Sequence, residues 1–87
     1  MTFLELLRAR LVELLAQRRG LEAGVERVYR TAGVRAFTEA ETVELAALRK
    51  AITDVDVESA AVCQRIDMIE EALADVADAA RVVSGRG

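Results

Sequence analysis

The chain has 87 residues, a net charge of −3 and no proline, histidine or tryptophan. A chain of this length forms at most one domain, and because small domains bury only about 60% of their unfolded surface, a core of two helices is marginally stable. Alanine, leucine, valine, glutamate and arginine dominate, which is a composition suited to long helices. A single cysteine excludes an internal disulfide. No uncharged run approaches the roughly 20 residues that a membrane span needs.

The charges are divided between the two parts of the chain. Residues 1–35 hold seven arginines against four glutamates, whereas residues 36–87 hold five basic and eleven acidic residues. Opposite charges on successive helices favour packing of one against the other. Because the arginines alternate with glutamates, the concentrated basic surface of a nucleic-acid-binding protein is missing. We therefore expect a cytoplasmic protein with neither nucleic acid nor a membrane as its partner.

The first predicted helix covers residues 2–32. Its apolar residues recur at alternating steps of three and four, which is the pattern of a helix that buries a narrow seam against another helix. Gly20 and Gly24 weaken the helix locally, but the pattern passes both without a change of phase. A competing interpretation makes 25–30 and 34–37 a β-hairpin. The seam residues predicted for this helix are Leu4, Leu7, Leu11, Leu14, Leu21, Val25 and Val28.

A turn over residues 33–37 is predicted to join two antiparallel helices. Gly33 suits a helix C-cap because glycine adopts the left-handed conformation without a steric penalty. Thr38 and Glu41 have the spacing of a capping box, in which the threonine hydroxyl accepts the Glu41 amide and the glutamate side chain accepts the Thr38 amide. This pair predicts the start of the second helix.

The second predicted helix covers residues 38–83 and is followed by a flexible tail, residues 84–87. Its own seam residues within the hairpin are Leu45, Leu48, Ile52, Val55 and Val62. At 1.5 Å per residue the first helix is about 45 Å long and the second about 68 Å, so the first reaches only to about Met68 or Ile69. The seam beyond has no partner in the same chain, which predicts an oligomer interface. The oligomer interface is assigned to this seam and the residues at its border: Ile66, Ile69, Leu73, Val76, Ala80 and Val83.

The fold class predicted is therefore all-α, with 1–87 as a single domain: an antiparallel two-helix hairpin with coiled-coil-like helices that self-associates into a helical bundle. β-Branched residues at the second seam position of five heptads disfavour a parallel two-stranded coil and favour antiparallel or larger bundles. They are Val55, Val62, Ile69, Val76 and Val83. A dimer of hairpins forming a four-helix bundle is the first expectation.

Four polar features of the sequence bear on its chemistry. Arg18 interrupts the first seam and is expected near Asp54, Asp56 or Glu58 of the second helix. Either it makes a register-setting contact there, or its aliphatic part lies on the seam while its charge stays in water. Ser59 is expected to hydrogen-bond to a carbonyl one turn earlier. Cys63 is expected to be half-buried and, with no histidine to activate it, not catalytic. The Asp54–Ser59 stretch lacks the glycine of a calcium loop. We predict no enzyme activity, cofactor or metal.

The order of these parts resembles the N-terminal scaffolding (delta) domain of tailed-bacteriophage major capsid proteins of the Hong Kong ninety-seven type. The resemblance rests on the capping box and the heptads, and it spans nearly the whole chain. The residues that carry it are Leu4, Leu7, Leu11, Leu14, Arg35, Phe37, Thr38, Glu41, Leu45, Leu48, Ile52 and Val55.

The resemblance implies a capsid-assembly role inside an immature phage head, where such a domain guides coat subunits through helix–helix contacts and is removed by a phage protease. Coat and protease proteins would then be partners besides a second copy. Because no coat domain follows Gly87, we expect a fragment or a separate scaffold. Two alternatives stay open. The first is a phage head–tail joining protein, which has a β-hairpin in place of the second half of the predicted first helix. The second is a bacterial coiled-coil adaptor or antitoxin-like protein that needs a partner chain.

Overall fold

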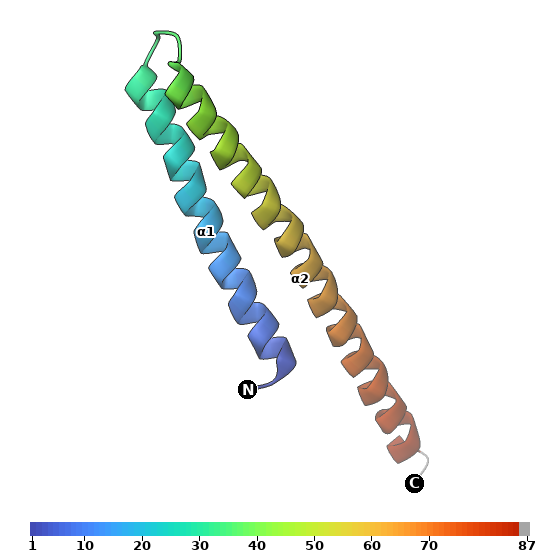
Figure 1. Ribbon diagram of the computed structural model, residues 1–87. Helices are drawn as coiled ribbons and strands as arrows, with labels where there is room; N and C mark the ends of the chain where they lie inside the picture. The colour runs from blue at the N-terminus through green and yellow to red at the C-terminus, as the bar shows by residue number, and fades with distance from the viewer. Residues whose placement is uncertain (86–87) are drawn as a thin grey trace.

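The computed structural model describes the backbone of residues 1–85 and the side chains of residues 1–78. It contains helix α1, Phe3–Ala32, and helix α2, Glu39–Gly85, which lie antiparallel as a hairpin (Figure 1). The predicted all-α helical hairpin is confirmed. The molecule is a rod of 75 × 19 × 18 Å with a radius of gyration of 21.2 Å, against about 12 Å for a compact domain of this length.

Helix α1 begins and ends with side-chain and backbone caps. The Thr2 hydroxyl accepts a hydrogen bond from the Glu5 amide at 3.1 Å. At the other end the Gly33 amide donates to the Tyr29 carbonyl at 2.9 Å, with Gly33 at φ +60°. Glycine is needed there because a side chain is strained at positive φ. Residues 25–30 are helical, so the β-hairpin interpretation of this segment is wrong.

The turn into α2 is held by a network centred on Glu41. Its carboxylate accepts the Thr38 amide at 2.9 Å, and the Glu41 amide donates to the Thr38 hydroxyl at 3.1 Å, so both bonds of the capping box are present. Arg35 donates to both carboxylate oxygens of Glu41 at 2.7 and 2.9 Å. The Tyr29 and Phe37 rings pack edge to face with centroids 5.1 Å apart. The network fixes where α2 begins relative to the end of α1.

Acid is expected to weaken this turn. The hydrogen bond from Arg35, helped by the Thr38 amide, lowers the pKa of Glu41 from its ordinary 4.5 to about 2. A carboxyl with a depressed pKa stabilises the fold above its unfolded-state pKa and loses that contribution as the pH falls through the folded value. The melting temperature, followed by circular dichroism, should therefore fall between about pH 4.5 and pH 2.

The control for the acid prediction is a pair of charge-removing variants. Glu41→Gln keeps an acceptor for the Thr38 amide but cannot titrate, so its melting temperature should change less over the same pH range. Glu39→Gln removes the same charge from the first turn of α2 and should behave like the unmodified chain. Equal pH profiles for the two variants would contradict the role given to Glu41.

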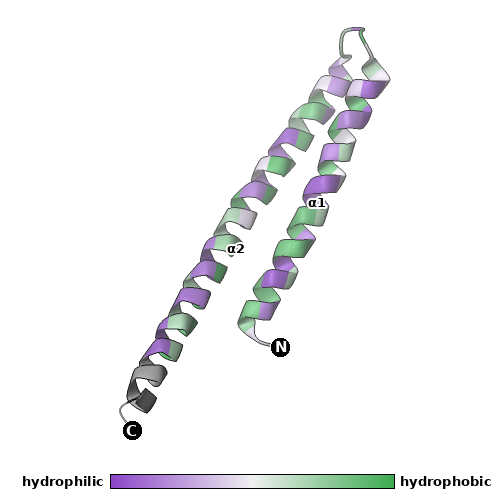
Figure 2. Cartoon of the chain, turned by 180° about the vertical axis from the view of Figure 1, so that it is seen from behind, coloured by the Kyte–Doolittle hydropathy of each residue, from purple (hydrophilic) through white to green (hydrophobic). Residues whose placement is uncertain are grey.

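The apolar seam between the helices lies where the alternating pattern places it. All twelve residues expected to form the intrachain seam are buried or half-buried. In Figure 2, which colours the ribbon by hydropathy, apolar and polar segments alternate along both helices. Leu14 is fully buried, and Val28 and Ala32 are 4% and 5% exposed. Arg18, at the one charged position of the α1 seam, is half-buried. The core is thus a single row of side chains rather than a three-dimensional cluster.

Two glycines of α1 offer a matched test of this packing. A Cβ added at Gly20 meets nothing within 4 Å, whereas one added at Gly24 lies 3.2 Å from Leu48 Cδ2. Gly20→Ala should therefore raise the free energy of unfolding by about 0.8–1 kcal/mol through helix propensity alone. Gly24→Ala has the same propensity gain but must displace the Leu48 side chain, so it should stabilise less. Urea denaturation of both variants measures the difference, and an equal gain would show that Leu48 moves freely.

Three details differ from the expectations. The helix continues through Ser84 and Gly85, so the predicted end at Val83 and the flexible start of the tail at Ser84 are wrong, and residues 86–87 lie outside the described part. Cys63 is exposed rather than half-buried, because it follows a seam residue on the outer edge of the helix. The Ser59 hydroxyl oxygen is buried without a hydrogen-bond partner, so the expected bond to a backbone carbonyl is absent.

Ion pairs join the two helices along their edges. The Nε atoms of Arg10 and Arg18 each lie 2.7 Å from a carboxylate of α2, Glu58 and Asp56 respectively, and Arg8 bonds to Glu70 at 2.7 Å. These hydrogen bonds lower the pKa of Asp56 and Glu58. Arg18 also pairs with Glu22. Exposed pairs contribute only about 0.2–1 kcal/mol each, so they select the register more than they stabilise the hairpin.

Candidate self-association interface

Helix α2 extends beyond the end of α1. With 47 residues against 30, α2 runs past the N-terminus of α1 as the orange-to-red segment of Figure 1. The pair between Arg8 and Glu70 lies close to this end of α1. We call residues 71–85 of α2, which lie beyond this pair, the overhang.

Exposure along the α2 seam changes at the overhang. Ile66 is 8% exposed, so its assignment to the oligomer interface is wrong: α1 covers it inside the hairpin. Ile69 is half-buried at the border. Leu73 and Val76 are 56% and 67% exposed. Ala80 and Val83, the other two residues assigned to this interface, lie outside the residues whose side chains are described.

The residues that flank the seam also change in character at the overhang. Where α1 covers α2, the positions directly beside seam residues include Asp56, Glu58, Arg65 and Glu70, three of which bind arginines of α1. Beside the exposed seam, by contrast, the two equivalent edge positions are alanines: Ala72 precedes Leu73, and Ala77 follows Val76. The acidic side chains of the overhang occupy other faces of the helix, at Glu71, Asp75 and Asp78. The exposed seam therefore has uncharged edges.

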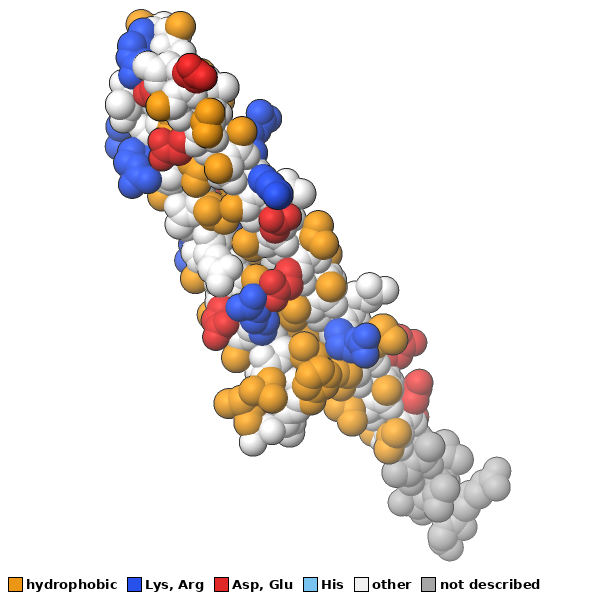
Figure 3. Space-filling view, in the orientation of Figure 1, with side chains coloured by type: hydrophobic (Ala, Val, Ile, Leu, Met, Phe, Trp, Pro, Cys, Tyr) orange, Lys and Arg blue, Asp and Glu red, His pale blue; other side chains and the backbone are white. Residues whose placement is uncertain are grey.

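Further apolar side chains surround the beginning of α1. Phe3, Leu6 and Met68 are 59%, 52% and 54% exposed. Figure 3 shows hydrophobic side chains gathered where the N-terminus of α1 lies beside α2, next to the start of the overhang. Contiguous apolar surface of this kind is typical of a protein–protein contact.

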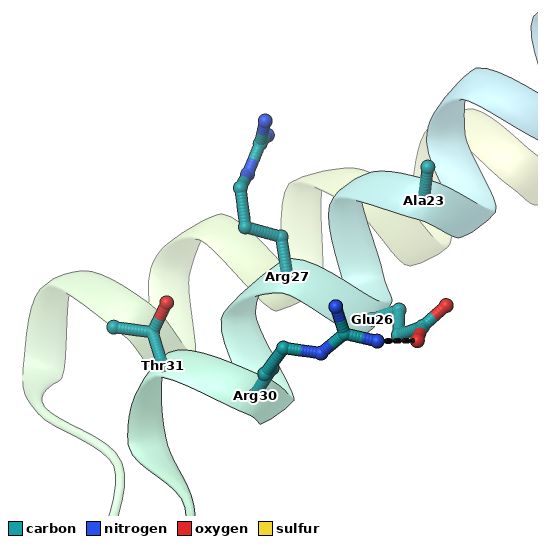
Figure 4. A pocket seen from close by; sticks show the side chains of 5 residues that line it. All are labelled: Ala23, Glu26, Arg27, Arg30 and Thr31. Carbon is teal, nitrogen blue, oxygen red and sulfur yellow. Dashed lines mark hydrogen bonds and ion pairs between the residues drawn. The ribbon is translucent and has the colours of Figure 1, made fainter.

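A shallow hollow of about 370 Å³ lies at the other end of the rod (Figure 4). Ala23, Glu26, Arg27, Arg30 and Thr31 line it, and Arg30 is paired with Glu26. All five residues come from one face of α1, so no second element encloses a ligand there. Among the residues with described side chains, no group of three or more potential ligands is placed to hold a metal ion. No helix in the described part of the chain combines the length and apolarity needed to cross a bilayer.

Comparison with known proteins gives no relative: no family model, no curated protein and no solved structure matches the chain.

Proposed function

We propose that the chain is a non-enzymatic assembly module whose copies associate reversibly through the overhang. The observation that carries the proposal is the exposure of Leu73 and Val76, 56% and 67%, on the same seam that is buried or half-buried where α1 covers it. A seam of alternating three- and four-residue steps is a surface for another helix. Leaving it in water forgoes roughly 25 cal/mol for each Å² of apolar surface, so covering it drives association.

The size of the surface suits a reversible contact. The chain exposes 6740 Å², whereas a compact protein of this mass exposes about 5,000 Å². The two strongly exposed seam residues form a short interface. Its buried surface area is well below the roughly 1,200–2,000 Å² that stable complexes bury. A contact that is weak singly gains strength when several copies are held together. This is the behaviour needed in assembly that must correct its errors.

A capsid-assembly scaffolding role is the more specific form of the proposal. It is supported by the resemblance described above, whose capping-box residues Thr38 and Glu41 form the expected pair of hydrogen bonds. In that role the module brings coat subunits together and a protease later removes it. If the role is right, co-expression with the coat protein of the same phage should give closed shells, and shells of unchanged yield and shape without the module would contradict it.

The self-association is tested with two valines of equal exposure. Val76 is 67% and Val57 66% exposed, but Val57 lies off the seam, on the part of α2 that α1 covers. Val76→Glu should raise the dissociation constant of the oligomer at least about tenfold because it places a charge in the interface. Val57→Glu should leave it unchanged. Sedimentation velocity from micromolar to millimolar concentration measures both.

Other results of the sedimentation experiment would contradict the proposal. A monomer at every concentration excludes self-association through the overhang. Equal weakening by both variants shows that net charge, rather than the seam, controls association. Association that requires an unrelated chain would instead favour the coiled-coil adaptor.

A further inference from the structure

We infer that the partner of the overhang is the overhang of a second copy, paired antiparallel with the two-fold axis near Val76. This inference rests on the proposed function and adds the identity and direction of the partner helix. Three observations carry it: the position of α1 on the seam, the uncharged edges of the overhang, and the place of Val76 within the overhang.

The position of α1 decides the direction of the partner. The exposed seam of the overhang continues the seam that α1 covers, so a helix that covers Leu73 and Val76 lies in line with α1. In a parallel, in-register pair, the partner helix would continue past Ile69 into the space that α1 occupies. In an antiparallel pair, the partner helix runs away from α1 instead. The second copy therefore fits only in the antiparallel direction.

The edges of the overhang decide the kind of partner. Inside the hairpin, α1 is matched to α2 by arginines that bind the flanking carboxylates, such as Arg10 to Glu58 and Arg18 to Asp56. Beside the exposed seam, Ala72 and Ala77 offer no charge for a basic helix to recognise. Small flanking residues also let two identical helices approach without repulsion between like charges, because Asp75 and Asp78 lie on other faces of the helix. A second copy is the partner that this pattern fits.

The location of the axis follows from the extent of the overhang. Ile69 is the last half-covered seam residue, and α2 ends at Gly85. An antiparallel pair that covers this segment on both copies has its centre in the middle, near Val76. The contact is isologous, because each copy uses the same surface. Val76 of one copy then faces Val76 of the other, whereas Leu73 lies roughly 9 Å along the axis from its counterpart.

Cysteine cross-linking tests this arrangement in the full chain. All variants carry Cys63→Ser, which removes the exposed native thiol. Val76→Cys, Leu73→Cys and Val57→Cys are oxidised with copper phenanthroline, and the disulfide dimer is followed on non-reducing gels. A disulfide needs Cα atoms about 4.4–6.8 Å apart. Val76→Cys should therefore cross-link at least about tenfold faster than Val57→Cys, while Leu73→Cys should resemble Val57→Cys. Circular dichroism verifies that each variant keeps the helicity of the unmodified chain.

Each other outcome overturns the inference. Fast cross-linking of both Leu73→Cys and Val76→Cys indicates a parallel pair, and fast cross-linking of Leu73→Cys alone indicates a different register. If neither exceeds Val57→Cys while sedimentation still shows Val76-dependent association, the geometry is wrong and the proposed function stands. If sedimentation shows no association at all, both are wrong.

Discussion

Leu14→Ala is expected to lower the free energy of unfolding by about 3–5 kcal/mol, which leaves the hairpin largely unfolded. Leu14 is completely buried, and it is the one large side chain in the described part of the chain that is. Truncation removes its buried methyl groups and leaves a cavity, since a single row of seam residues has few neighbours that can fill the space. A domain of this size has only about 3–5 kcal/mol of stability to lose. Urea denaturation followed at the helical circular dichroism band measures the loss.

The adjacent residue supplies the control for this prediction. Leu15 is 47% exposed on the edge of the same helix. Leu15→Ala is the same substitution as Leu14→Ala, and alanine keeps a high helix propensity at both positions. We expect its effect to stay below about 1 kcal/mol. If the two variants lose equal stability, the seam is not the source of the hairpin's stability, and helix propensity or self-association must supply it.

Ser59→Ala is expected to raise the free energy of unfolding by about 1–3 kcal/mol, the penalty of a buried polar atom that lacks a partner. The Ser59 hydroxyl oxygen is enclosed in the seam with no hydrogen bond. Alanine removes that oxygen, creates little cavity and is the better helix former. The same urea denaturation measures the gain.

Thr53 is the control for the serine prediction. Its hydroxyl donates to the Arg49 carbonyl at 3.0 Å, which is the type of bond that Ser59 lacks. Thr53→Ala therefore removes a satisfied and exposed hydroxyl, and we expect a smaller gain that arises from helix propensity alone. A Ser59→Ala gain no larger than that of Thr53→Ala would show that water reaches the Ser59 hydroxyl.

The seam and the cap could be read from the sequence because each depends on neighbouring residues. A heptad pattern fixes which face of a helix is apolar, as at Leu14 and Val55, and a capping box needs only Thr38 and Glu41 three residues apart. Arg18 was expected close to residues 54–58, and it binds Asp56 in that range. Such features follow from periodicity and from the short turn.

The remaining features depend on how far one helix slides along the other. Ile66 and Leu73 occupy equivalent heptad positions, yet Ile66 is buried and Leu73 is exposed. The reason is that α1 covers α2 at Ile66, whereas Leu73 lies beyond the N-terminus of α1. The unpartnered Ser59 hydroxyl depends on its rotamer, which periodicity does not determine. The bond from Arg35 to Glu41 and the edge-to-face contact of Tyr29 with Phe37 arise from the path of the turn. A sequence pattern contains no signal for any of them.

The closed turn limits how large an assembly this contact can build. At that end of the rod the α2 seam position nearest the turn is occupied by Glu41, whose carboxylate is paired with Arg35, so the apolar seam itself does not continue past the turn. In the symmetric pair proposed for the opposite end, each copy uses its exposed seam completely. Stoichiometry should therefore stop at two rather than grow into a filament, and any larger lattice must draw on a second, chemically different contact.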